Sequence, residues 1–190
     1  MTRTIIRFFG AFILACIMAA PVFADITAGS ATATFETGYG PTTLSDGRAY
    51  FLAGAEYRVR VQALDPENTV ITDWNQIILE LRESGTMRHQ ITVNVLATPT
   101  VSSTTAICSV IDNTSVYSNL DFTITFRLRW TITAAQEFGW GANQVYVSVS
   151  EDNGTASSDT DTISTNYGIC ASIAVYNFDQ DGVAADDRIN

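Results

Sequence analysis

Hydrophobic and polar residues alternate with a period of two along much of this chain, and the pattern is clearest between Asp121 and Thr133. Every even position from Phe122 to Ile132 is apolar, and every odd position is polar or charged. Successive side chains of a β-strand point to opposite faces of the sheet, whereas a helix repeats every 3.6 residues. The segment therefore predicts one long strand with a buried face and a solvated face.

The same alternation predicts further strands, and polar turns separate them. The clear segments are 57–63, 76–82, 90–97, 144–150 and 169–176, and the weaker ones are 31–37, 50–52 and 106–111. The turns are Ser45–Gly47, Asp65–Asn68, Glu83–Gly85 and Asp152–Gly154, and the interval Glu83–Arg88 suits a hairpin.

This pattern predicts an all-β fold of about eight or nine strands, an antiparallel β-sandwich in which each sheet has one buried face. A closed barrel is the alternative, and the uneven strand lengths favour the sandwich. No segment sustains a helical period, so Ala134–Glu137 is expected to form only a turn. Residues 25–49, rich in Thr, Ala, Gly and Ser, are expected to be less ordered.

The amino-terminal residues have the layout of a secretory signal peptide. Arg3 and Arg7 precede an apolar run, and Ala24 ends a stretch of small residues suited to cleavage. The predicted organisation is a signal peptide over 1–24, a β-sandwich domain over 25–176 and an acidic tail or linker over 177–190. The protein is thus expected to be secreted or held at the cell surface, extracellular or periplasmic. A retained membrane anchor and a lipoprotein modified at Cys16 are the alternatives, although the apolar run is shorter than a membrane span.

The charge of the chain restricts its partners. The sequence has a formal net charge of −10 and no lysine, and loss of Arg3 and Arg7 with the leader changes −10 to −12. Such a surface repels nucleic acid and anionic membranes, and it is compatible with divalent cations. No membrane span is expected after cleavage. The expected partners are other surface or extracellular proteins, or glycans.

Two cysteines, Cys108 and Cys170, follow the leader, and in an oxidising compartment they are expected to form one disulfide. Closing a loop of about 60 residues stabilises by roughly 4 kcal/mol in the chain-entropy model. Two buried thiols are the alternative. Cys170 alternates with Ile169, so a bridge at this position is expected on an outer face or at a sheet edge.

Groups suited to catalysis are few. His89 is the one histidine, it lies in phase with Ile91 and Val93, and no nucleophile-elbow motif accompanies it. Among the acids, Glu80 is the best placed for paired-carboxylate chemistry, on a strand beside Arg82. A zinc site is not expected from one histidine and two cysteines. The sequence therefore favours a protein that is not an enzyme and needs no cofactor, apart from a possible calcium ion.

Calcium prefers several carboxylate and carbonyl oxygens on a tight loop. One candidate site is in the acidic tail, formed by Asp179, Asp181, Asp186 and Asp187. A second is the group that begins at Glu151 and continues with Asp159 and Asp161. Solvated loops that keep the protein soluble are the alternative, because neither segment has the full spacing of a calcium-binding loop.

Exposed tryptophans are the other candidates for binding. Trp140 lies between two glycines, so its ring suits a ligand-binding anchor or, alternatively, a cap on the open end of the sandwich. Trp74 is nearer a strand start and is expected in the core. The rows of Thr and Arg on the polar side of the 121–133 strand fit strand propensity and edge protection.

The segment Tyr57–Glu83 resembles bacterial immunoglobulin-like domains of surface proteins, with two alternating strands around the turn Asp65-Pro66-Glu67-Asn68. The resemblance implies a β-sandwich module with a structural or adhesive role. It departs from the immunoglobulin pattern because Trp74 precedes both cysteines. Two alternatives stay open: a carbohydrate-binding domain or glycoside hydrolase fragment, and a pilus-type assembly subunit.

Overall fold

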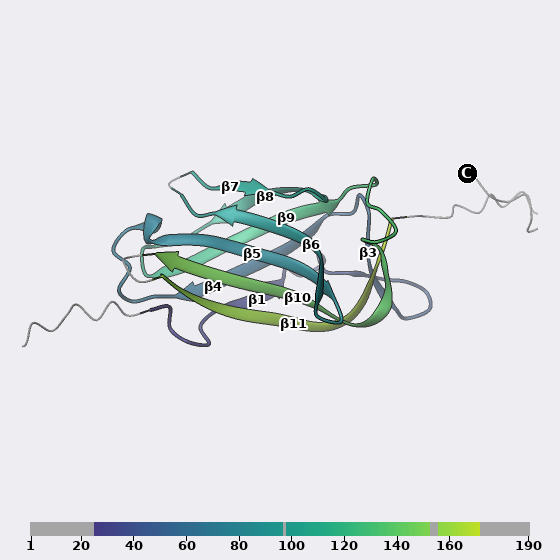
Figure 1. Cartoon of the computed structure of the whole chain (residues 1–190), viewed down its shortest axis with the longest axis horizontal. Helices are drawn as coiled ribbons and strands as arrows, with labels where there is room; N and C mark the ends of the chain where they lie inside the picture. Colours follow the sequence, from purple (N-terminus) through teal and green to yellow (C-terminus); the bar gives the residue numbers. More distant parts are fainter. Residues whose placement is uncertain (1–24, 97, 153–155, 172–190) are drawn as a thin grey trace, which may run out of the picture.

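The computed structural model describes residues 25–96, 98–152 and 156–171, which form two β-sheets packed face to face (Figure 1). The smaller sheet has the strand order β1-β4-β9-β8, and the larger has the order β2-β3-β11-β10-β5-β6-β7. Neighbouring strands are antiparallel except β3 and β11, which are parallel. The predicted all-β sandwich is confirmed, but the described residues form eleven strands and not the eight or nine expected.

The four-stranded sheet consists of β1 (Thr32–Phe35), β4 (Tyr57–Leu64), β8 (Ala106–Asn113) and β9 (Asn119–Leu128). The seven-stranded sheet consists of β2 (Thr42–Thr43), β3 (Ala49–Leu52), β5 (Trp74–Glu83), β6 (Thr86–Asn94), β7 (Thr100–Ser102), β10 (Phe138–Asp152) and β11 (Ala156–Cys170). A single 3-10 turn, η1 (Ile71–Asp73), precedes β5. No helix within the described residues has the length and apolar character needed to cross a membrane.

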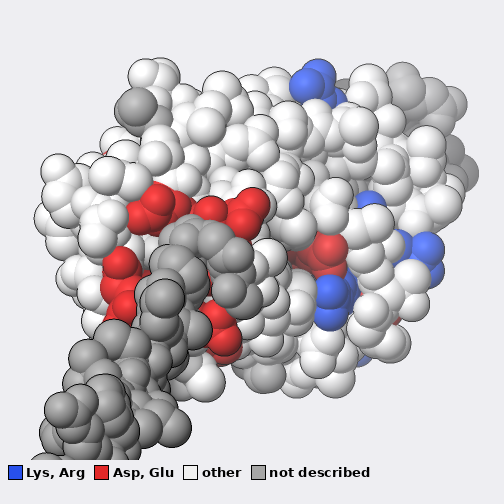
Figure 2. Space-filling model, turned by 60° about the vertical axis from the view of Figure 1, so that its left-hand side comes forward, with Lys and Arg blue, Asp and Glu red and all other residues white. Residues whose placement is uncertain are grey.

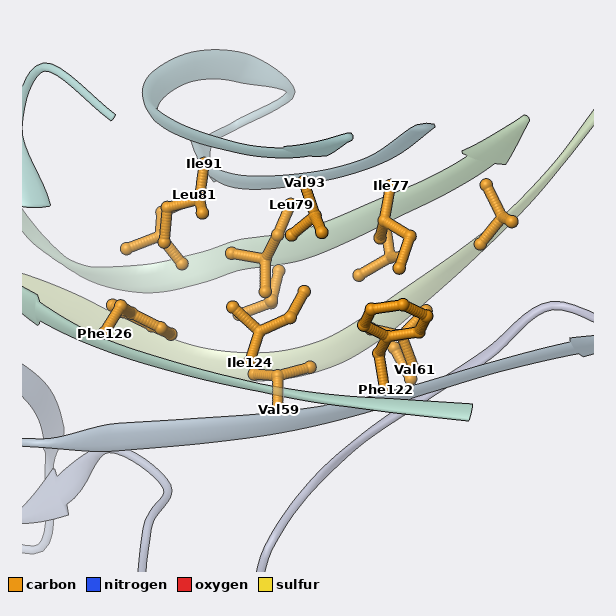
Figure 3. Close-up of a cluster of buried hydrophobic side chains, with 14 of the residues drawn as sticks. Val59, Val61, Ile77, Leu79, Leu81, Ile91, Val93, Phe122, Ile124 and Phe126 are labelled. Carbon is orange, nitrogen blue, oxygen red and sulfur yellow. The ribbon is translucent and has the colours of Figure 1, made fainter. Parts of the chain in front are cut away.

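The core lies between the two sheets and is formed by the apolar residues that alternate along the central strands (Figure 3). The four-stranded sheet contributes Val59 and Val61 from β4 and Phe122, Ile124 and Phe126 from β9; the seven-stranded sheet contributes Ile77, Leu79 and Leu81 from β5, Ile91 and Val93 from β6, and Val145, Val147 and Val149 from β10. These side chains are at most 2% exposed. The alternation read from the sequence is therefore the alternation of buried and outward side chains in both sheets.

The end of the core near β3 is aromatic. The ring of Phe51 lies edge-on to those of Tyr57 and Tyr167, with centroids 4.7 and 4.9 Å apart, and the Phe126 ring is 6.0 Å from that of Phe51. Trp74 fills the opposite end with no exposed surface, as predicted, and its Nε1 donates a hydrogen bond of 2.8 Å to the Tyr117 carbonyl. Edge-to-face rings thus fill the end near β3, and the buried Trp74 fills the other end.

Local turn chemistry agrees with the sequence at the β5–β6 hairpin. Ser84 and Gly85 both have positive φ, 48° and 85°, as the tight hairpin turns of antiparallel strands require. At the turn after β4, the Asp65 carboxylate accepts a hydrogen bond of 2.9 Å from the backbone N–H of Glu67. Ala134–Glu137 forms a turn, as predicted.

Three predictions about strand positions are wrong. The strand predicted to reach Thr133 ends at Leu128, because the chain turns at residues 129–132, where Ile132 N donates to Arg129 O; Trp130, within this turn, is 59% exposed. Residues 25–49, expected to be less ordered, contain β2 and the start of β3 as well as β1, which confirms the weaker strand predicted for 31–37. The long strand β11 was expected to begin only at Ile169, and its actual first half shows no apolar alternation.

Polar residues of β11 face inward because they bind the edge of the other sheet. Asp159 Oδ2 accepts a hydrogen bond of 2.8 Å from Ala31 N, and Asp161 Oδ2 accepts one of 2.7 Å from Ala33 N. Ile26 N donates to Ser157 Oγ at 3.0 Å. Side chains of β11 therefore accept hydrogen bonds from backbone N–H groups along the β1 edge of the four-stranded sheet. We call Asp159, Asp161 and their two backbone donors the edge clasp.

Candidate functional site

Trp140, the sequence-predicted binding residue, lies at the start of β10 with 41% of its surface exposed. Its neighbour across the strands is Gly168 of β11, and the ring of Tyr50 from β3 covers that glycine. A Cβ atom on Gly168 would lie 2.6 Å from Tyr50 Cε1 and 2.9 Å from Trp140 N, so only glycine fits. The Arg48 guanidinium lies 5.5 Å from the centroid of the Trp140 ring. The close approach of three strands thus fixes an exposed tryptophan at the end of the sheet.

A second ring lies six positions further along β10, at Tyr146. The Arg82 guanidinium lies 3.5 Å from the centre of this ring, close enough for a cation–π contact. Arg82 also binds the Glu80 carboxylate at 2.6 Å, and Gln90 donates to the same carboxylate at 3.2 Å. Tyr146 is therefore held in place by charged and polar neighbours, and it alternates with the buried Val145 and Val147, so it faces outward.

We call the outward face of the seven-stranded sheet the polar face. Tyr146 belongs to it by alternation, and we assign Trp140, which lies at a register shift of β10, to the same face because its ring is exposed beside Arg48. At 3.3 Å per residue, six positions place Trp140 and Tyr146 about 20 Å apart. The outward positions between and beside them carry mainly amide and hydroxyl groups: Ala142, Gln144 and Ser148 on β10, Thr160, Thr162 and Asn166 on β11, and Gln76, Asn94 and Thr100 on β5, β6 and β7. Gln76 and Asn94 are hydrogen bonded at 2.9 Å, and Asn94 and Thr100 at 3.2 Å.

The outward face of the four-stranded sheet is charged, because it carries several ion pairs. Glu56 binds Arg58 at 2.8 Å and Arg127 at 2.7 Å, and Arg60 binds Asp121 at 2.5 Å. These contacts lower the pKa of Glu56, mainly through its hydrogen bonds to Arg127 and Arg58. The predicted rows of Thr and Arg on β9 are thus part of a charged face, whereas on the polar face the Arg82–Glu80 pair stands among neutral amide and hydroxyl groups.

His89 and Glu80, the residues considered for catalysis, are both engaged in structural contacts. His89 is 2% exposed, as its phase with Ile91 suggested, and its Nε2 lies 2.8 Å from the Gln136 carbonyl in the β9–β10 loop. Burial lowers the pKa of His89, and the bond to Gln136 opposes this only in part. Glu80, 8% exposed, is bound by Arg82 and Gln90. His89 therefore holds a loop, and Glu80 positions Arg82.

The predicted disulfide between Cys108 and Cys170 is not present in the structure. Cys108 lies on β8 of the four-stranded sheet and packs against the core. Cys170 ends β11 of the seven-stranded sheet and alternates with the buried Ile169, so it faces outward. A bridge needs Cβ atoms that point toward each other, and these two positions face different sides of the sandwich. Burial raises the pKa of the Cys108 thiol, which disfavours the reactive thiolate.

The calcium predictions have two outcomes. Asp179, Asp181, Asp186 and Asp187 lie outside the described residues, so calcium at these positions stays a prediction. In the second group, Glu151 accepts a hydrogen bond of 2.7 Å from Ser157, while Asp159 and Asp161 belong to the edge clasp. Acidic side chains gather at one end of the molecule (Figure 2), but the described residues contain no group of three His, Cys, Asp or Glu placed to hold a metal ion.

Sequence reasoning identified Trp140 but missed Tyr146, Tyr50 and Gly168. The phase of Tyr146 relative to Val145 and Val147 was a usable signal for an outward ring. The contact of Tyr50 with Gly168 arises from parallel pairing between strands far apart in the sequence, which no local pattern reveals.

The sequence matches no protein-family model, and a search of curated proteins finds no match. The resemblance to immunoglobulin-like surface domains, the signal peptide at 1–24 and the tail at 177–190 therefore stay predictions.

Proposed function

We propose that this protein is an exported, non-enzymatic β-sandwich module that acts in adhesion at the cell surface or outside the cell, with the polar face as its contact surface. The observation that carries the proposal is the pair of outward rings, Trp140 and Tyr146, on one strand of a broad sheet. Exposed aromatic side chains that are fixed in place give binding energy at low entropic cost.

The position of the rings supports this reading. β10 is the central strand of the seven-stranded sheet, so the backbone beneath Tyr146 is paired with β11 on one side and with β5 on the other, while the segment around Trp140 lies beside β11 alone. The contacts of His89 and Glu80 support a non-enzymatic role, because both side chains already serve neighbouring residues of the fold. The acidic net charge suits a protein that stays soluble outside a cell.

The test is a binding assay with the full chain against immobilised fibronectin, collagen, mucin and peptidoglycan. The wild type should bind at least one of these, and Trp140→Ala should weaken that binding about tenfold, which corresponds to about 1.4 kcal/mol. Tyr117→Ala is the matched control, because Tyr117 is 59% exposed and lies at the other end of the sandwich, beside Trp74.

The melting temperature of each variant establishes that it is folded. Binding that Trp140→Ala leaves unchanged would refute the proposed contact surface. Release of soluble products from any of the four ligands, lost in Glu80→Gln or His89→Ala, would show that the protein is an enzyme instead.

A further inference from the structure

We propose that the polar face binds an uncharged polysaccharide that lies extended along β10, with Trp140 and Tyr146 stacking on two of its sugar rings. The inference rests on the proposed function and names the class of ligand. It follows from three features of the described face: the spacing of the rings, the side chains between them and the balance of charge.

The spacing of the rings indicates the length of the ligand. Trp140 and Tyr146 lie at most about 20 Å apart along β10; alternation turns Tyr146 outward, and Trp140, at a register shift of the strand, is exposed beside Arg48. A single sugar cannot contact both rings, whereas an oligosaccharide of several units can. The Trp140 backbone is packed closely against Gly168 and its ring has Arg48 at 5.5 Å, and the Tyr146 ring has Arg82 at 3.5 Å. The two stacking surfaces are therefore arranged before the ligand binds.

The side chains between the rings indicate hydroxyl-bearing units. Gln144 of β10 and Asn166 of β11 face outward in this interval, beside the small Ala142. An amide group donates and accepts hydrogen bonds, as a sugar hydroxyl does. The fully buried centre of a protein–protein interface is, by contrast, usually more apolar than this interval. The side chains between the rings are polar or small, which suits a chain that carries hydroxyl groups along its length.

The charge balance indicates an uncharged ligand. The Arg82 guanidinium is paired with Glu80 at 2.6 Å, and the Arg48 guanidinium is near Asp46 at 3.8 Å. Neither arginine therefore offers an unopposed positive charge to a carboxylate or sulfate on a sugar. The net charge of −10 also repels polyanions over a distance of several ångströms. A positively charged polysaccharide is not favoured either, because the acidic side chain beside Tyr146, Glu80, is only 8% exposed and is already paired with Arg82.

The experiment is calorimetric titration of the full chain with cellohexaose, xylohexaose, mannohexaose and chitohexaose, with hexagalacturonate as the anionic comparison. At least one neutral hexasaccharide should bind, and the corresponding disaccharide should bind at least about tenfold more weakly, because it cannot reach both rings. Trp140→Ala and Tyr146→Ala should each reduce the association constant at least about fivefold, which is about 1 kcal/mol. Tyr117→Ala should bind like the wild type.

The outcomes separate this inference from the function beneath it. If a protein ligand binds through Trp140 and no neutral hexasaccharide binds, the glycan inference is overturned and the adhesive function stands. If neither class binds, both are overturned. Stronger binding of hexagalacturonate than of the neutral sugars would contradict the charge argument. If Trp140→Ala fails to fold, Tyr146→Ala and Gln144→Ala carry the test, and unchanged affinity in both refutes the proposed path along β10.

Discussion

The edge clasp between β11 and β1 is predicted to make a measurable contribution to stability. In Asp159→Ala the backbone N–H of Ala31, which is 4% exposed, loses its acceptor at 2.8 Å. An unpaired buried donor costs about 1–3 kcal/mol, and because the carboxylate is partly exposed we expect the lower half of that range, about 1–2 kcal/mol. Asp161→Ala should cost a similar amount, since Ala33 N donates at 2.7 Å.

Urea unfolding at pH 7 measures the loss of unfolding free energy. In thermal unfolding, each single variant should lower the melting temperature by about 3–6 °C. Hydrogen exchange at the amides of Ala31 and Ala33 should accelerate more than exchange in β9, because the edge strand opens before the core. Asp112→Ala is the control, since it removes the same charge from an exposed position on β8. If Asp159→Ala costs no more than Asp112→Ala, the clasp does not stabilise the sandwich.

The clasp also predicts a dependence of stability on pH. Burial raises the pKa of Asp159, but hydrogen bonds from backbone N–H groups, led by that of Ala31, outweigh it and lower the pKa below its ordinary value of 3.8. Its contribution to stability is therefore complete above the pKa of the unfolded chain and is lost as the pH falls through the lower folded value. The difference in unfolding free energy between wild type and Asp159→Ala should shrink below about pH 4. A difference that persists undiminished at pH 2 would contradict this assignment.

Three further variants test the packing. Ile124→Ala, in the centre of the core, should lower the urea-unfolding free energy by about 2–5 kcal/mol, whereas Thr125→Ala on the opposite face of β9 should cost under about 1 kcal/mol; equal costs would contradict the assignment of faces. Gly85→Ala should cost about 1 kcal/mol in the same assay, because φ of 85° strains any residue with a Cβ; no loss would mean that the turn adapts. Gly168→Ala should lower the melting temperature and shift tryptophan fluorescence, since its Cβ would meet Tyr50 and the Trp140 backbone; wild-type values for both would refute this close approach.

The alternation of apolar residues located a strand correctly where its inward side chains are apolar and failed where they are polar. β9 and β5 have apolar residues at inward positions and pair with neighbours that do the same, so alternation located them. In the first half of β11 the inward residues include Asp159 and Asp161, which bind backbone N–H groups, so the same rule overlooked all of this strand before Ile169. The rule also extended β9 to Thr133, because alternation continues into a loop in which Trp130 packs against Gly54.

The difference between the two outward faces explains why a ligand surface is expected on the larger sheet. On the smaller sheet, a ligand would displace water from the ion pairs of Arg58, Glu56 and Arg127, and desolvating such charges offsets much of the binding energy. Between the rings of the polar face a ligand exchanges hydrogen bonds between neutral groups and water for similar bonds to itself, which costs little; the Arg82–Glu80 pair beside Tyr146 is the charged exception. The net gain then comes from stacking on Trp140 and Tyr146, which already lie fixed on the central strand of the sheet and lose little freedom on binding.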